Sequence, residues 1–334
     1  MTDPVQEVDA LAAESQFAGV VRVDRGDEIV FERAYGLARR DTGAPNTPET
    51  QFATASGLKG MTALAVMCLV EDGVLALDTT ARSVLGDDLP LIGDDVTVEH
   101  LLAHRSGIGD YLDEDAEEYD TTDYIIPVPV HTLLGPEDYV PILDGFPAKF
   151  TPAGSDFAYC NGGFVVLALI AERASGVPYH DLVLQRVCEP AGLDDTAFLR
   201  SDELPARAAH GHLFADGPRT NVLHLPVRGT GDGGIYTTVG DMRTFWKALF
   251  EGKIVTQERV AEMVAPRSDA YEGWQYGLGF WLMAETPAVG IRGYDAGVSF
   301  TSLHDPETDM TCTVVSNWTD GAWPLARLTN GLYR

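Results

Sequence analysis

Basic residues are scarce in this sequence of 334 residues, and their scarcity limits which partners the protein can bind. Lysine and arginine number 23 against 51 aspartates and glutamates, so the formal net charge at pH 7 is −28. Repulsion between this charge and a polyanion disfavours nucleic acids and anionic membrane surfaces as partners. The acidity also suits a solvated surface in a salty cytoplasm. The densest acidic stretch, "DEDAEEYD" at 113–120, is typical of a solvated loop.

Cysteine and long apolar runs are also sparse. The four cysteines, Cys68, Cys160, Cys188 and Cys312, are far apart among apolar neighbours, so neither a disulfide framework nor a thiolate metal site is indicated. No apolar run is long enough to span a membrane. The opening "MTDPVQEVDALAAES" has neither the basic start nor the apolar core of a signal peptide. We therefore expect a cytoplasmic protein with no membrane partner.

Hydrophobic residues make up 45% of the chain, which is enough for a sizeable core. The segment 19–36 alternates like a β-hairpin, similar runs recur in the C-terminal third, and 161–176 has a helical pattern. These patterns predict an α+β fold, in which an antiparallel sheet from both ends of the chain is flanked by helices. We expect residues 1–75 and 225–334 to form the sheet lobe and residues 76–224 an inserted, mostly helical lobe, with a site between them.

A serine and a lysine stand three residues apart in "QFATASGLKGMTALAVMCLVEDG" (51–73). Ser56 and Lys59 lie where a helical pattern begins, so they share one face of its first turn. A lysine with a lowered pKa can accept the proton of a serine hydroxyl, and a helix N-terminus can hold an oxyanion. The spacing alone also occurs by chance at the start of surface helices.

A second element, Tyr159-x-Asn161, stands just before an apolar helix. Together with the Ser56–Lys59 pair, it resembles the serine beta-lactamase-like and penicillin-binding hydrolase superfamily, specifically its class C beta-lactamase, esterase and D-aminopeptidase branch. The resemblance implies the beta-lactamase/transpeptidase-like form of the α+β fold and extends over nearly the whole chain. Three longer segments also match this branch in the expected order: "VTVEHLLAHRSGIGDY" (96–111), "GDGGIYTTVGDMRTFWKALFEGKIV" (231–255) and "YGLGFWL" (276–282).

The resemblance implies a role for each matching residue. Ser56 matches the acylated nucleophile, and Lys59 matches the group that accepts its proton. Tyr159 matches the phenol that passes a proton to the leaving group. Asn161 matches the side chain that positions Lys59 and the substrate carbonyl.

The third motif of the branch differs in this chain. Relatives carry Lys or His, then a variable residue, then Gly, on the strand that lines the site, whereas this chain has Ile291, Arg292 and Gly293. Ile291 is therefore expected at the cation's place in the substrate pocket. Neighbouring strand residues point to opposite faces, so a bulge or a shifted alignment would be needed to bring Arg292 or Asp295 inward. The backbone amide of Tyr294 matches the second donor of the oxyanion hole.

These features predict a serine hydrolase that forms an acyl-enzyme with a small-molecule ester, lactone or amide, without a metal or an organic cofactor. Loss of the cation favours substrates that lack a carboxylate. Beta-lactamase or D-alanyl peptidase activity remains an alternative. A ligand-binding or sensor protein on the same scaffold is a second one, which the intact set of Ser56, Lys59 and Tyr159 disfavours. The sequence leaves the oligomeric state open.

Overall fold

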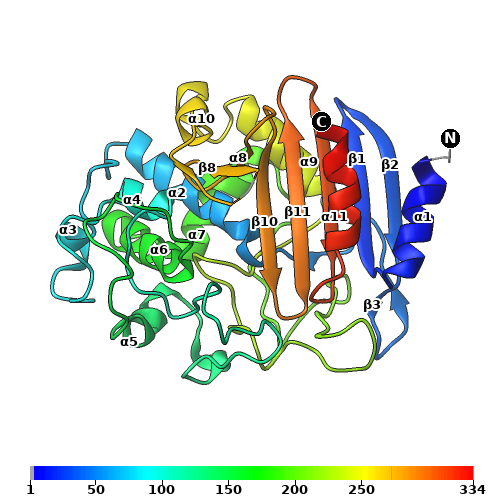
Figure 1. The fold of residues 1–334 in the computed structure, drawn as a ribbon, viewed down its shortest axis with the longest axis horizontal. Helices are drawn as coiled ribbons and strands as arrows, with labels where there is room; N and C mark the ends of the chain where they lie inside the picture. The colour runs from blue at the N-terminus through cyan, green and yellow to red at the C-terminus, as the bar shows by residue number, and fades with distance from the viewer. Residues whose placement is uncertain (1–3, 272, 334) are drawn as a thin grey trace.

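The central feature of the computed structural model is an eight-stranded antiparallel sheet (Figure 1). The structure describes residues 4–271 and 273–333. The strand order is β2-β1-β12-β11-β10-β9-β8-β7. The strands are β1 (Gly19–Arg25), β2 (Glu28–Tyr35), β7 (Ser268–Asp269), β8 (Trp274–Tyr276), β9 (Trp281–Met283), β10 (Val289–Asp295), β11 (Val298–Asp305) and β12 (Met310–Ser316).

The sheet unites the two ends of the described chain, as the sequence predicted. Strand β1 pairs with β12 over its whole length, and Gly19 lies opposite Ser316. Two further pairs of short strands, β3 (Leu37–Arg39) with β4 (Ala44–Pro45) and β5 (Phe52–Ala53) with β6 (Tyr236–Thr237), lie outside this sheet. The β5–β6 pair leads into the segment that carries Ser56.

Helices cover both faces of the sheet, which explains why its central strands are apolar on both sides. Val21 and Val314 pack in one hydrophobic cluster with the helices α1 (Pro4–Glu14) and α11 (Trp323–Asn330). The adjacent residues Val20 and Val315 pack in the other cluster, with α2 (Lys59–Glu71) and α9 (Val239–Phe250). This alternation follows from the period of two along a strand. In Figure 1, α11 lies in front of the sheet.

The remaining helices are mostly concentrated in the middle of the chain. They are α3 (Ala81–Leu85), α4 (Val98–Leu102), α5 (Val140–Leu143), α6 (Asn161–Ser175), α7 (Tyr179–Val183), α8 (Glu189–Ala191) and α10 (Gln257–Met263). The apolar helix α6 is buried from Asn161 to Ala171, ends at the left-handed Gly176, and packs against α2. This contact joins the two predicted lobes, whose boundaries at 75/76 and 224/225 remain a prediction.

Two expectations concern the membrane and the cysteines. Within residues 4–271 and 273–333, no helix is both long enough and apolar enough to cross a membrane. All four cysteines are free thiols and are buried.

The antiparallel sheet and the helices that flank it confirm the predicted α+β fold.

Candidate active site

Ser56 lies in a tight turn immediately before α2. The turn is a short 3₁₀ helix, η1 (Ala55–Leu58), and α2 continues from Lys59. Ala55 has a φ of +46°, which is sparsely populated for a residue with a side chain and persists only where the surroundings hold it. Its carbonyl accepts a hydrogen bond from the amide of Gly234 at 3.2 Å. The structure thus fixes the nucleophile candidate between α2 and the glycine-rich segment around Gly234.

Lys59 is a buried lysine whose amine joins the turn of Ser56 to two more distant segments. Its Nζ donates to Ser56 Oγ at 2.8 Å, to Asn161 Oδ1 at 2.7 Å and to the backbone carbonyl of Asp232 at 2.7 Å. The side chain is 2% exposed. Burial lowers the pKa of Lys59, and nearby carboxylates, led by Asp232, oppose this only in part. A lysine in this state can serve as the base for Ser56.

Tyr159 lies in an aromatic cluster beside the same lysine. Lys59 Nζ is 5.0 Å from the centre of the Tyr159 ring. The ring stacks on Trp281 at 5.9 Å and lies 4.3 Å from the imidazole of His104. Burial raises the pKa of Tyr159 well above its ordinary value, and a hydrogen bond with Ser56 acts in the opposite direction. The phenol therefore holds its proton close to the serine.

Asn161 connects Lys59 to the acidic loop at 113–120. While its Oδ1 accepts from Lys59, its Nδ2 donates to Glu114 Oε1 at 2.8 Å. The sequence predicted a solvated loop here, and residues 115–118 are indeed exposed. For Glu114 that prediction was wrong, because its side chain turns inward to the site and is largely buried. Its partner Asn161 is distant in the sequence, so local composition gives no signal for this contact.

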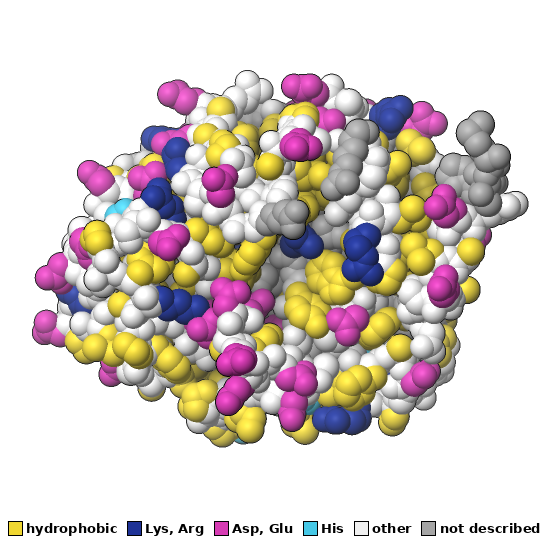
Figure 2. Space-filling view, viewed as in Figure 1, with side chains coloured by type: hydrophobic (Ala, Val, Ile, Leu, Met, Phe, Trp, Pro, Cys, Tyr) yellow, Lys and Arg dark blue, Asp and Glu magenta, His cyan; other side chains and the backbone are white. Residues whose placement is uncertain are grey.

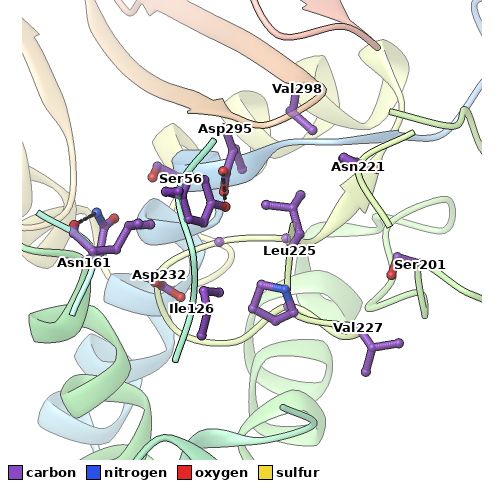
Figure 3. Close-up of a pocket in the computed structure, with 18 of the residues that line it drawn as sticks. Ser56, Ile126, Asn161, Ser201, Asn221, Leu225, Val227, Asp232, Asp295 and Val298 are labelled. Carbon is purple, nitrogen blue, oxygen red and sulfur yellow. Dashed lines mark hydrogen bonds between the residues drawn. The ribbon is translucent and has the colours of Figure 1, made fainter. Parts of the chain in front are cut away.

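Three carboxylates line a cavity that opens beside Ser56. Glu114, Asp232 and Asp295 form this acidic cavity (Figure 3), and no lysine or arginine of the described chain lines it. Tyr111 donates to Asp232 Oδ2 at 2.6 Å, and the hydroxyl of Tyr124 donates to Asp295 Oδ1 at 2.8 Å. Burial raises the pKa of each of the three carboxyl groups, that of Asp295 to about 7. Asp232 and Glu114 are thus site residues that sequence reasoning missed.

The third motif lies on β10, where neighbouring side chains point to opposite sides. Ile291 is 2% exposed and packs in the core, where its Cγ2 would be 2.7 Å from a Cβ placed on Gly60 of α2. Ile291 was expected in the substrate pocket, but the structure puts Arg292 there instead. Because β10 pairs with β11 in unbroken register, no bulge is needed for Arg292 to face the site.

Arg292 belongs to a second pocket, on the other side of Ser56. This Arg292 pocket is lined by Ser56, Tyr159, Trp281, Arg292 and Trp323, among others, and Glu114 borders both hollows. Figure 2 shows a hollow near the centre of this face, with acidic side chains along one side and basic and hydrophobic ones along another. Ser56 therefore borders both a cavity with three carboxylates and a pocket that contains Arg292 and Glu114.

Gly293 allows β10 to touch the turn of Ser56. A Cβ at this position would lie 1.9 Å from the carbonyl oxygen of Thr54 and 3.0 Å from the amide nitrogen of Ser56. Only a glycine permits this approach without movement of the backbone. The next residue, Tyr294, lines the Arg292 pocket, and its hydroxyl donates to Asp320 at 2.9 Å. The strand thus runs directly beside Ser56.

The described residues contain no group of three or more histidines, cysteines, aspartates or glutamates arranged to hold a metal ion. The polar groups around Ser56 are engaged with one another through hydrogen bonds.

Comparisons with known proteins agree with this geometry. The family model described as Beta-lactamase matches residues 5–330. Esterase EstB of Burkholderia gladioli is 34% identical, over 84% of this chain and 80% of the esterase. Penicillin-binding protein 4* of Bacillus subtilis is 28% identical over 84% of this chain.

The structural comparison covers almost the whole chain. A crystal structure of a penicillin-binding protein from Bacillus halodurans has a TM-score of 0.90 and 33% identity, covering 98% of this chain and 100% of that one. The chain spans 63% and 66% of the length of the two Bacillus subtilis penicillin-binding relatives it matches. The chain belongs to the beta-lactamase family.

Proposed function

We propose that this chain is a serine hydrolase that cleaves ester or amide bonds through an acyl-enzyme on Ser56. The observation that carries the proposal is the 2.8 Å hydrogen bond between Lys59 Nζ and Ser56 Oγ, made by a lysine whose pKa burial lowers. A base within hydrogen-bonding reach is what a serine hydroxyl needs to become a nucleophile. Tyr159 and Asn161 complete the group around it.

The reaction follows from this arrangement. Neutral Lys59 accepts the proton of Ser56 as Oγ attacks the substrate carbonyl carbon. The backbone amides of Ser56 and Tyr294 hold the resulting oxyanion. Tyr294 belongs to β10, which reaches the turn of Ser56 because Gly293 has no side chain. Tyr159 passes its proton to the departing alcohol or amine and receives in exchange the proton that Lys59 took from Ser56. Water then attacks the acyl-enzyme and gives a proton to Lys59, which passes it to Ser56 Oγ as the acid is released.

The relatives support ester and amide substrates. Esterase EstB is 34% identical to this chain, which covers 80% of the esterase. A D-aminopeptidase of Brucella ovis is 28% identical over 67% of this chain. Other relatives are named penicillin-binding proteins, so beta-lactamase or D-alanyl peptidase activity stays an alternative. The cytoplasmic location remains a prediction from the sequence.

Covalent labelling and hydrolysis test the proposal together. The wild-type protein should react with a fluorophosphonate probe at Ser56 and hydrolyse 4-nitrophenyl acetate, and Ser56→Ala should lose both activities. Ser155→Ala, which removes an exposed hydroxyl, serves as the matched control. A wild-type protein that neither reacts with the probe nor hydrolyses the ester would favour the ligand-binding alternative.

A further inference from the structure

We propose that Arg292 is an anion-binding residue of the active site, which selects substrates with a carboxylate near the scissile carbonyl. The substrate class rests on the proposed function, whereas the binding of a carboxylate at Arg292 does not. The inference reverses the preference for uncharged substrates that the loss of the motif cation suggested. It starts from a charge that has no opposite partner among the residues that the structure describes.

Among the described residues, the contacts of the Arg292 guanidinium are with aromatic rings. Its Cζ lies 4.8 Å from the centre of the Trp274 ring and 5.6 Å from that of Trp323. Within the part of the chain that the structure describes, it forms no ion pair, and none of its N–H groups donates a hydrogen bond. Other partly buried arginines do have such partners, as Arg22 does with Asp24 and Glu32.

The physical state of this arginine favours an external anion. Burial lowers the pKa of Arg292, yet a guanidinium remains charged in proteins, so the residues that the structure describes compensate its charge poorly. Indole faces fix the guanidinium plane and leave its N–H edge for a ligand. A carboxylate matches that edge with two parallel hydrogen bonds.

The surrounding charges decide on which side of Ser56 an anion can bind. The acidic cavity is lined by Glu114, Asp232 and Asp295, so it repels a substrate carboxylate. The Arg292 pocket shares Ser56 and Glu114 with that cavity, but it contains the Arg292 guanidinium and lacks Asp232 and Asp295. Because Ser56 and Arg292 line the same pocket, a carboxylate bound at Arg292 lies in the same hollow as the carbonyl that Ser56 attacks.

Equilibrium binding tests the site without catalysis. Benzoate is titrated against the Ser56→Ala protein at constant ionic strength, with the fluorescence of the neighbouring tryptophans as the signal and benzyl alcohol as the uncharged comparison. We expect saturable binding of benzoate, weakened about tenfold or more when Arg292→Gln is added to Ser56→Ala. Arg292→Lys in the same background should retain part of it, because it keeps the charge and loses the two-pronged geometry.

Kinetics test the substrate class. Two pairs of esters differ only by a carboxylate: 4-nitrophenyl hydrogen glutarate against 4-nitrophenyl valerate on the acyl side, and 3-acetoxybenzoate against 3-tolyl acetate on the leaving-group side. In at least one pair, Arg292→Gln should lower the ratio of kcat/KM for the anionic over the neutral ester by about tenfold. Arg327→Gln removes the same charge from an exposed position on α11 and serves as the control.

The outcomes separate this proposal from the proposed function. The anion site is overturned if benzoate does not bind, or if it binds equally well to Ser56→Ala and to the double variant that also carries Arg292→Gln. Ratios that stay unchanged in both ester pairs overturn the substrate class. A protein that binds benzoate through Arg292 but hydrolyses no ester and escapes fluorophosphonate contradicts the hydrolase and leaves the anion site standing.

Discussion

Lys59 combines full burial with three hydrogen bonds, and this combination determines how the site should respond to pH. The neutral amine is the form that can accept the proton of Ser56. Because burial lowers the pKa of Lys59, this form becomes populated at a lower pH than for an exposed lysine. At acidic pH, the small fraction of Lys59 that is deprotonated should therefore limit activity.

We predict that kcat/KM for an uncharged ester rises with pH and levels off below the ordinary pKa of lysine. Lys59→Ala should lower the rate by about two orders of magnitude or more. A pH series of initial rates for both proteins is the measurement, and Lys149→Ala, at a partly buried lysine paired with Asp113, is the control. A rising limb that persists unchanged in Lys59→Ala would assign it to another group.

Asp295 gives a second prediction, on stability. The pKa of its carboxyl group is raised by burial to about 7, above the ordinary value of about 4. Between these values the folded state binds more protons than the unfolded state, so the contribution of Asp295 to stability falls as pH rises through this window. An asparagine can still accept the hydrogen bonds from Tyr124 and the amide of Ala296, and it never ionises.

Asp295→Asn should therefore stabilise the protein at pH 8 relative to wild type, by on the order of 1–4 kcal/mol, and much less at pH 4. Melting curves at the two pH values measure the difference. Glu117→Gln, which removes a negative charge from the exposed part of the 113–120 loop, controls for net charge. A gain of equal size at both pH values would mean that ionisation of Asp295 is not its cause.

Local spacing explains which site residues could be predicted from the sequence. Ser56 and Lys59 are one helical turn apart, so their proximity in space follows from their positions in the chain. Glu114 and Asp232 reach the same site from separate loops. Glu114 accepts a hydrogen bond from Asn161, and the backbone carbonyl of Asp232 accepts one from Lys59. Such contacts depend on the tertiary fold, and nothing in the neighbouring residues signals them.

At the scale of elements, the contact between β10 and η1 determines the geometry of the site. The strand was expected because its motif resembles that of the family, whereas the hairpin of β1 and β2 was expected from a period of two that is visible in the residues themselves. The direction of the Arg292 side chain toward the site could not be predicted in this way. It depends on which face of β10 packs against α2, and the packing of Ile291 against Gly60 determines this face.

We predict that Gly293→Ala lowers kcat/KM by about two orders of magnitude or more while the protein remains folded. The added methyl group would collide with the backbone carbonyl of Thr54, so β10 must move away from Ser56 and the oxyanion hole opens. Gly290→Ala on the same strand is the control, since its methyl group meets the end of the Leu303 side chain, which can move. Activity and circular dichroism of both variants would be compared, and a fully active Gly293→Ala would contradict this account.

At the scale of the whole molecule, the net charge of −28 implies strong self-repulsion in the folded state. Molar KCl should raise the melting temperature because it screens the 51 carboxylates from one another. A melting temperature that is the same in dilute buffer and in molar KCl would show that self-repulsion does not limit stability. Sulfate is unsuitable for this test, because it stabilises most proteins by exclusion from their surface.

The pairing of β1 with β12 has a consequence for synthesis on the ribosome. Val20 and Val21 leave the ribosome long before their strand neighbours Val315 and Val314 are translated. Until then the hairpin of β1 and β2 has an open edge, and before α2 and α9 are translated the face with Val20 lacks these helices, conditions in which nascent chains aggregate or engage chaperones. The sheet can close only after β12 has been translated, and its high contact order makes that closure slow.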